Sequence, residues 1–126
     1  MKEKQLEVTE WDPYNRNCPT RKILNKIGDQ WTVLVIGSLE TGPMRFSELK
    51  RAIDGISQKM LTQTLRGLEA DGLVARTVTP QIPPRVDYEL TDLGRTLIEP
   101  LAGLEKWAKE HMSQILQIRE SSTNNS

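Results

Sequence analysis

The chain has 126 residues, of which 37% are hydrophobic and 27% charged, a composition typical of one soluble globular domain. Its 17 basic and 17 acidic residues cancel, so overall charge gives no argument for nucleic-acid binding. The longest mainly apolar run, residues 31–39, is shorter than the ~20 residues that span a bilayer, and no apolar segment follows the charged N-terminus. With a single cysteine, we expect a cytoplasmic protein without an internal disulfide or a membrane partner.

The N-terminal part of the chain divides into an arm and a first helix. Residues 1–17 carry no helical or strand period, and we expect Trp11 and Tyr14 to fold back on the body, because aromatic side chains in a polar arm are rarely left in water. A helix is predicted to begin near Pro19, a residue favoured in a first helical turn, and to end at Gly28.

Three further helices are predicted between residues 31 and 68. The segment 31–40 is apolar on nearly all sides, which is typical of a central buried helix. After a break, Ser47 is expected to cap a third helix, and Ser57 to cap a fourth over 57–68. Two short helices joined by a tight turn at Gly55 form a helix-turn-helix pattern.

The helix over 57–68 has two faces of different chemistry. Leu61, Leu65 and Leu68 fall on one face at helical spacing. The other face lacks acids and offers amide, hydroxyl, ammonium and guanidinium groups, from Gln58, Lys59, Thr62, Gln63 and Arg66. Such groups hydrogen-bond base edges and phosphate oxygens, but a merely solvated face carries similar groups, so the helix alone leaves both interpretations open.

A β-hairpin is predicted to follow this helix. Residues 73–79 are rich in strand formers, residues 85–90 alternate polar and apolar side chains, and three prolines between them stiffen the connection. A helix-turn-helix followed by a hairpin predicts a winged helix, a mainly α fold with one small β-hairpin. Three side chains would sit where a wing meets the DNA backbone or minor groove: Arg76, Gln81 and Arg85.

The C-terminal part is predicted to be one long helix, opened by Thr91 as its cap and kinked at Pro100. Apolar residues then recur in steps of four and three, the spacing of a coiled-coil seam that packs on a second subunit. The expected dimer interface combines this seam with the first helix: Ile23, Leu97, Leu101, Leu104, Trp107, Ala108, His111 and Ile115. His111 either sets the register of the seam or charges near neutral pH.

Several motifs together resemble the HxlR family of bacterial transcriptional regulators. They follow one another over about residues 18–110: Cys18-Pro19, Gly28-Asp29-Gln30-Trp31, Arg45-Phe46-Ser47-Glu48-Leu49, Gly55-Ile56-Ser57-Gln58-Lys59-Met60-Leu61-Thr62, Leu68-Glu69-Ala70-Asp71-Gly72-Leu73, Pro83-Pro84-Arg85-Val86-Asp87 and Tyr88-Glu89-Leu90-Thr91-Asp92-Leu93-Gly94. The resemblance implies a winged-helix dimer related to the MarR type that binds operator DNA. Some members respond to aldehydes, quinones or oxidants, and the resemblance does not imply which signal acts here.

We therefore expect an arm over 1–17, a winged-helix domain over 18–94, a dimerisation helix over 95–120 and a disordered tail over 121–126. Two-fold symmetry would place two copies of the fourth helix in successive major grooves of a pseudo-palindromic operator, about 34 Å apart. The expected contacts to double-stranded DNA are Arg45, Ser47, Lys50, Arg51, Ser57, Gln58, Lys59, Thr62, Gln63, Arg66, Gln81 and Arg85.

Cys18 is the candidate for a switch operated by oxidants or electrophiles. It precedes the first helix, close in sequence to Arg16, Arg21 and Lys22, and both a helix N-terminus and nearby cations stabilise the reactive thiolate. Some regulators that the chain resembles sense oxidants through a cysteine near this position. The alternative is a structural cysteine in a regulator that responds to a small molecule or acts constitutively.

Other function classes have less support in the sequence. One cysteine and one histidine rule out a Cys/His metal cluster, and neither a glycine-rich phosphate loop nor a nucleophile elbow occurs, so we expect no catalysis, cofactor or metal. A Cys18–His111 dyad would lack an orienting acid. A winged helix used for protein interaction would more often expose apolar anchors. A small-molecule effector would need a pocket, for which the candidate linings are Trp11, Trp31 and Trp107.

Overall fold

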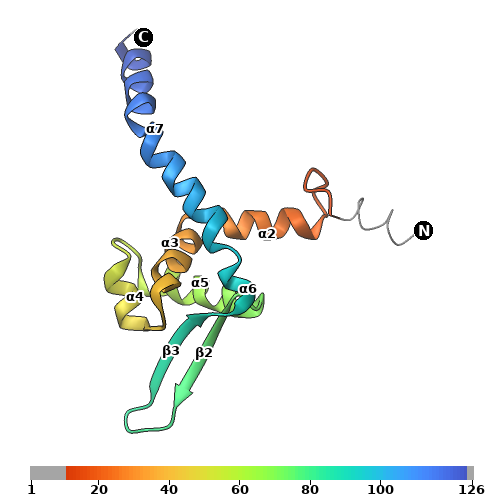
Figure 1. Ribbon diagram of the computed structural model, residues 1–126, viewed down its shortest axis with the longest axis vertical. Helices are drawn as coiled ribbons and strands as arrows, with labels where there is room; N and C mark the ends of the chain where they lie inside the picture. Colours follow the sequence, from red (N-terminus) through yellow and green to blue (C-terminus); the bar gives the residue numbers. More distant parts are fainter. Residues whose placement is uncertain (1–10, 125–126) are drawn as a thin grey trace, which may run out of the picture.

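The computed structural model describes residues 11–124, which form a winged helix with a long C-terminal helix rising from it (Figure 1). The first elements are α2 (Pro19–Ile27), α3 (Gln30–Ser38), the 3-10 turn η1 (Leu39–Thr41), β1 (Met44–Arg45), α4 (Phe46–Ala52) and α5 (Gln58–Ala70). They are followed by β2 (Val74–Thr79), β3 (Arg85–Leu90), α6 (Asp92–Arg95) and α7 (Ile98–Asn124). The predicted mainly α fold with a small hairpin is confirmed.

Side-chain caps fix where several helices begin. Asp29 caps α3, its carboxylate accepting from the N–H of Trp31 at 3.1 Å. The Ser57 hydroxyl caps α5 as predicted, accepting from the Met60 N–H at 3.0 Å. The prediction that Ser47 caps the third helix is wrong.

Helix α4 begins one residue before Ser47, because the chain passes directly from a strand into the helix. Arg45 is both the last residue of β1 and the N-cap of α4, and its N–H donates to Glu48 Oε1 at 2.8 Å. Ser47 is therefore an exposed residue of the first turn rather than its cap.

The wing is a hairpin of β2 and β3, extended by β1 into an antiparallel sheet of order β1-β3-β2. Tyr88 in the central strand lies opposite Met44 on one side and Arg76 on the other. Because β1 directly precedes α4 and pairs with β3, the helix-turn-helix and the wing are held in a fixed position relative to each other (Figure 1).

The core lies between α3, α5 and the base of the wing. Leu61, Leu65 and Leu68 of α5 are buried, as their spacing predicted, and pack with Val35 and Ile36 of the central helix. The predicted central helix is confirmed on this face. Leu34, the residue directly before Val35, remains exposed, which shows that α3 is not covered on all sides.

The C-terminal region differs from the predicted single helix. Thr91 caps α6 as expected, its hydroxyl accepting from the Gly94 N–H at 3.0 Å. A break at residues 96–97 then separates α6 from α7. Pro100 lies in the first turn of α7, where a backbone N–H is not needed, so it does not kink the helix.

Both ends of the described chain depart from the predictions. Helix α7 continues to Asn124, so the expected disordered tail is wrong for 121–124, while 125–126 lie outside the described residues. Trp11 is about half exposed and Tyr14 is 91% exposed, so neither packs back on the body as predicted. Residues 1–10 of the predicted arm lie outside the described part. Among residues 11–124, no helix is both long and apolar enough to cross a membrane.

Candidate nucleic-acid interface

The exposed face of α5 holds five of the predicted DNA-binding side chains together. Lys59, Gln63 and Arg66 are exposed, Gln58 lies beside them at the start of the helix, and Thr62 is half-buried. All five line one shallow surface hollow, and none of these lining residues is acidic. The leucines on the opposite side of α5 anchor the helix in the core, so this face has a fixed orientation toward solvent.

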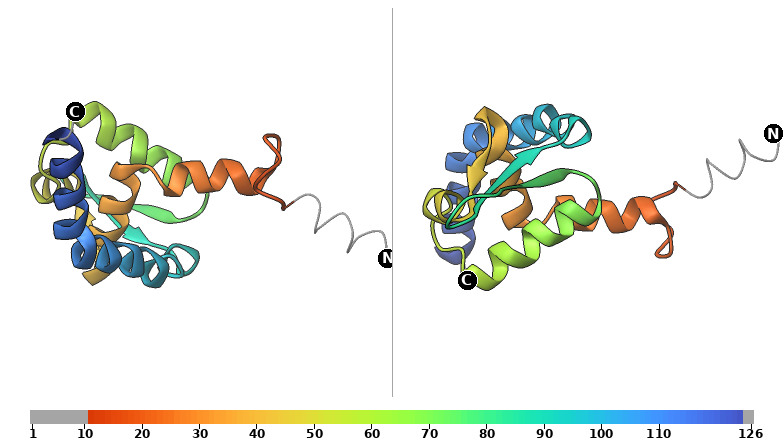
Figure 2. Two further views of the ribbon diagram at one scale, coloured as in Figure 1. Left: turned by 90° about the horizontal axis from the view of Figure 1, so that it is seen from above. Right: turned by 90° about the horizontal axis from the view of Figure 1, so that it is seen from below.

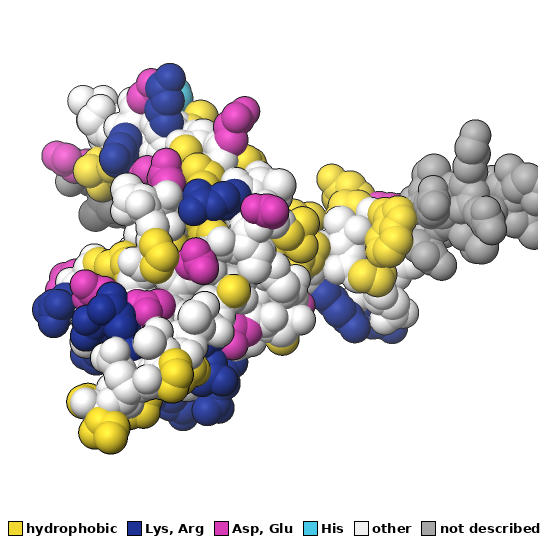
Figure 3. Space-filling model, turned by 60° about the horizontal axis from the view of Figure 1, so that its bottom comes forward, with side chains coloured by type: hydrophobic (Ala, Val, Ile, Leu, Met, Phe, Trp, Pro, Cys, Tyr) yellow, Lys and Arg dark blue, Asp and Glu magenta, His cyan; other side chains and the backbone are white. Residues whose placement is uncertain are grey.

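Helix α4 and the start of α5 add further polar groups to the same end of the molecule. Arg45, Ser47, Lys50 and Arg51 are all exposed, with the last two in the final turn of α4. Lys and Arg side chains gather on the lower half of the face shown in Figure 3. The Ser57 hydroxyl is engaged as the cap of α5, so what this residue offers an anion is the helix N-terminus.

The wing carries the remaining predicted contacts. Gln81 is exposed in the connection between β2 and β3. Arg85 is exposed too, but its Nε lies 3.1 Å from Asp87 Oδ2 on the same strand, so its charge is partly compensated. Arg85 is therefore a weaker candidate for phosphate binding than the sequence pattern indicated.

A second cleft, which the sequence did not reveal, lies between α5 and the wing. Glu69 of α5 and Arg76 of β2 form an ion pair across it, with Oε1 and Nε 3.6 Å apart. Tyr88 lies in the same cleft, and burial, followed by the Glu69 carboxylate, raises the pKa of its phenol. Glu69 and Arg76 are on different elements, so neither local periodicity nor a motif could have paired them.

The predicted dimer residues fall into two groups. Leu101 is only 7% exposed and packs in the core of its own chain, together with the half-buried Leu97. The prediction for Leu101 is therefore corrected, because this residue holds α7 onto the winged helix, whereas Leu97, just before α7, stays a prediction for the dimer interface. Farther along α7, Leu104 is 66% and Trp107 55% exposed, and Ala108 and Ile115 are half-buried.

Helix α2 presents a second uncovered surface. In the described part of the chain, no residue of α2 is fully buried: Ile23 is half-buried and Leu24 about half exposed. The end of α2 is fastened to α5, since Lys26 pairs with Asp71 and donates to the Gly67 carbonyl at 3.4 Å. Figure 2 shows α2 running beside α5 and then out from the body.

His111 lies on α7 and is held by its own helix. Its Nδ1 is 2.8 Å from the Trp107 carbonyl oxygen, and its ring stacks on Trp107 with centroids 4.7 Å apart. The ring is thus held against the side of α7 by contacts within its own helix.

Cys18 is the N-cap residue of α2 and only 3% exposed. Its carbonyl oxygen accepts from the N–H groups of Arg21 at 3.1 Å and Lys22 at 3.3 Å. The side chains of Arg16, Arg21 and Lys22 are exposed. Cys18 therefore lies at the start of a helix as predicted, whereas a sensing role needs a reagent to reach a buried sulfur.

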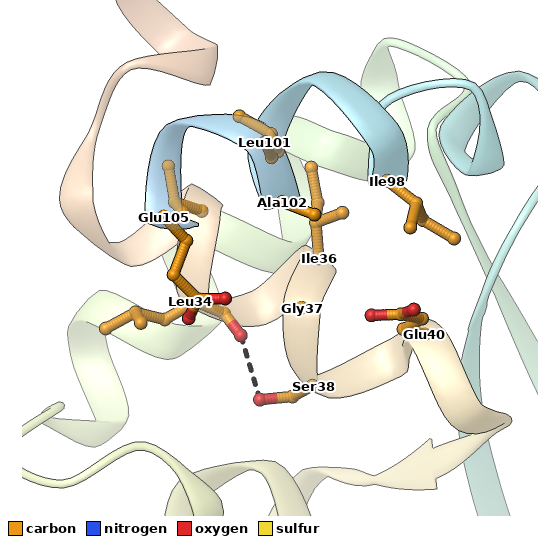
Figure 4. Close-up of a pocket in the computed structure, with 10 residues that line it drawn as sticks. Leu34, Ile36, Gly37, Ser38, Glu40, Ile98, Leu101, Ala102 and Glu105 are labelled. Carbon is orange, nitrogen blue, oxygen red and sulfur yellow. Dashed lines mark hydrogen bonds between the residues drawn. The ribbon is translucent and has the colours of Figure 1, made fainter. Parts of the chain in front are cut away.

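A hollow of about 250 Å³ lies between α3 and α7. Apolar side chains of both helices form its lining, with Glu40 and Glu105 at its edges (Figure 4). None of the three tryptophans named as candidate linings contributes to this hollow.

The fold and the acid-free exposed face of α5 define a winged helix-turn-helix protein. The chain belongs to the HxlR-like helix-turn-helix family, whose model matches residues 26–116. It is 38% identical over 114 residues to the uncharacterised HTH-type transcriptional regulator YtfH of Escherichia coli, covering 90% of each chain. The chain is thus a helix-turn-helix transcriptional regulator, and its relatives form a non-enzymatic class.

Solved structures agree with this assignment. The transcriptional regulator ytfH from Salmonella typhimurium is 38% identical and superposes with a TM-score of 0.81, over 86% of this chain and 97% of that one. The redox regulator HypR in its reduced form is 37% identical with a TM-score of 0.73, over 79% and 98% of the two chains.

Proposed function

We propose that this regulator binds double-stranded operator DNA in the cytoplasm, with α5 in the major groove. The acid-free exposed face of α5 carries the proposal, because its groups match base edges and phosphates while its leucines fix the helix in the core. Gln58, Lys59, Thr62 and Gln63 lie in the early turns that enter the groove. Arg45, Lys50 and Arg51 of the preceding elements contact phosphates, and Gln81 and Arg85 bring the wing to the backbone.

The same proposal includes a homodimer. Helix α2 has no fully buried residue in the described chain, and α7 exposes Leu104, Trp107 and Leu116 beyond the point where it leaves the body. Large apolar side chains exposed together on these two helices favour an interaction site there. A second copy would cover both helices, and its two-fold axis would repeat α5 one turn of DNA away.

Binding of a labelled random-sequence duplex of ~30 base pairs, long enough for two grooves, tests the DNA part of the proposal. We expect binding at low salt with an affinity that falls steeply as salt rises, because phosphate contacts release counterions. Lys59→Glu should weaken binding strongly. The matched control is Lys106→Glu, the same charge change on the exposed side of α7, which should bind as the wild type does.

Two results would contradict the proposal. One is binding that does not depend on salt, and the other is equal weakening by Lys59→Glu and Lys106→Glu. Analytical ultracentrifugation of the same samples tests the dimer, since a monomer at all concentrations would remove the two-fold arrangement.

A second candidate function is redox control through Cys18. The position of Cys18 at the start of α2, whose exposed face is the proposed dimer surface, supports it, as does the likeness to the redox regulator HypR. Because the sulfur is buried, oxidation must loosen the start of α2 and thereby disturb the dimer. Diamide should release wild-type protein from DNA and leave Cys18→Ser bound. Equal responses of both would make Cys18 structural and leave a constitutive or ligand-controlled regulator.

A further inference from the structure

The cleft between α5 and the wing is lined by two arginines and one glutamate. It has a volume of about 460 Å³, and its polar lining comes from Thr62, Arg66 and Glu69 of α5 and from Arg76 and Tyr88 of the sheet. It opens beside the proposed recognition face, since Thr62 and Arg66 line both hollows. A DNA strand leaving the major groove toward the wing would pass over this opening.

The charges in the cleft are arranged around the Tyr88 hydroxyl. The Glu69 carboxylate raises the pKa of Tyr88 after the larger effect of burial, whereas Arg76 and Arg66 lower it, so all three charged groups lie within electrostatic reach of this phenol. The phenol consequently keeps its proton at neutral pH and can donate a hydrogen bond. Two guanidinium groups and one hydroxyl form a donor set suited to phosphate oxygens.

One acid, Glu69, partly neutralises this donor set. The Glu69 carboxylate lies 3.6 Å from Arg76 Nε, and both side chains are partly exposed, at 30% and 51%. An ion pair this exposed contributes little to folding stability. Its main consequence is to orient the Arg76 guanidinium and to cancel part of its charge.

We propose that this cleft binds one backbone phosphate of the DNA through Arg66, Arg76 and the Tyr88 hydroxyl, and that Glu69 is a positioning residue that holds Arg76 until the phosphate displaces it. The inference rests on the proposed function and extends it to a defined contact. Glu69 acts as an internal counter-ion, so it weakens binding to every duplex alike and does not choose a sequence.

A double-mutant cycle on the full-length protein with the random-sequence duplex tests the inference. Arg76→Gln should weaken binding several-fold and make the slope of log K against log salt shallower by about 0.9, the value for one phosphate contact. Glu69→Gln should tighten binding several-fold, because Arg76 is no longer partly neutralised. In the Arg76→Gln background the Glu69→Gln gain should disappear.

Two controls separate this role from a structural one. Arg76→Lys keeps the charge and should restore most of the salt slope, and thermal unfolding of all variants should match the wild type. An unchanged slope in Arg76→Gln would overturn the phosphate site, and an equal Glu69→Gln gain in both backgrounds would overturn the positioning role. If Lys59→Glu still weakens binding, only the cleft inference has failed. If Lys59→Glu also binds normally, the proposed function itself has failed.

Discussion

Lys59 and Gln63 lie one turn apart on the exposed face of α5, yet their side chains allow different contacts. The lysine is a point charge that attracts any phosphate, whereas a glutamine amide can pair with the edge of an adenine. The role of each in binding should therefore separate when affinity and sequence preference are measured independently.

Gln63→Ala is predicted to reduce discrimination between a selected binding sequence and a scrambled one by about 1–3 kcal/mol, with the salt slope unchanged. Lys59→Ala should instead weaken both duplexes alike and make the slope shallower by about 0.9. Anisotropy titrations on both duplexes give the two quantities. If Gln63→Ala lost affinity equally for both sequences, the amide would not be reading bases.

Position 94 requires a glycine because the backbone of Leu73 packs closely against it. A Cβ built there would lie 2.0 Å from the Leu73 carbonyl oxygen, a backbone atom that also accepts the Thr91 N–H at 3.1 Å. We predict that Gly94→Ala lowers the free energy of unfolding by about 1–3 kcal/mol, the usual range for overpacking. Urea denaturation measures it.

The control is Gly103→Ala in α7, where an added Cβ meets nothing within 4 Å. It should be neutral or stabilise by up to about 1 kcal/mol, because alanine favours the helix. Equal stability of Gly94→Ala and the wild type would show that the turn between the wing and α6 tolerates a shift of the backbone.

At the scale of elements, periodicity predicted most of the helices and the wing, because each buries one face against a common core. Periodicity could not show which apolar residues of α7 pack on their own chain and which are left for a second subunit. Leu101 and Leu104 fit one seam, but the first packs inside its own chain and the second is exposed. A step of three or four residues marks an apolar face and does not identify what covers it.

Two alanine variants of α7, one at a buried leucine and one at an exposed leucine, separate folding stability from dimer stability. Leu101→Ala should lower the free energy of unfolding by about 2–5 kcal/mol, because it leaves a cavity in the core. Leu104→Ala should instead raise the dissociation constant of the dimer and make the melting temperature depend more on protein concentration. Sedimentation and thermal melts over a concentration series distinguish them. Identical behaviour of the two variants would contradict this separation.

Local signals also failed where two elements meet. The pairing of β1 with β3 moves the start of α4 ahead of Ser47, and the break at 96–97 places Pro100 in a first turn. Neither effect is encoded in the few residues around it. The Glu69–Arg76 pair is the same kind of case, because it depends on how α5 faces the wing.

At the scale of the whole molecule, α2 and the far part of α7 extend from the winged helix (Figure 1). The winged helix buries its own core, whereas Leu24 of α2 and Leu104 and Trp107 of α7 are exposed. The face with α5 and the wing carries the proposed DNA contacts, and the two extensions carry the proposed dimer contacts. In the proposed dimer, Cys18 at the start of α2 would connect the two, since a change there would alter the spacing of the two α5 helices.

Selection of binding sequences from a random duplex library by the full-length protein tests this arrangement most directly. We predict enrichment of an inverted repeat whose half-site centres are about 10 base pairs apart, or a multiple of that spacing, because two α5 helices related by two-fold symmetry enter major grooves on one side of the DNA. Recovery of no common sequence, or of a single asymmetric site bound by one chain, would contradict the account.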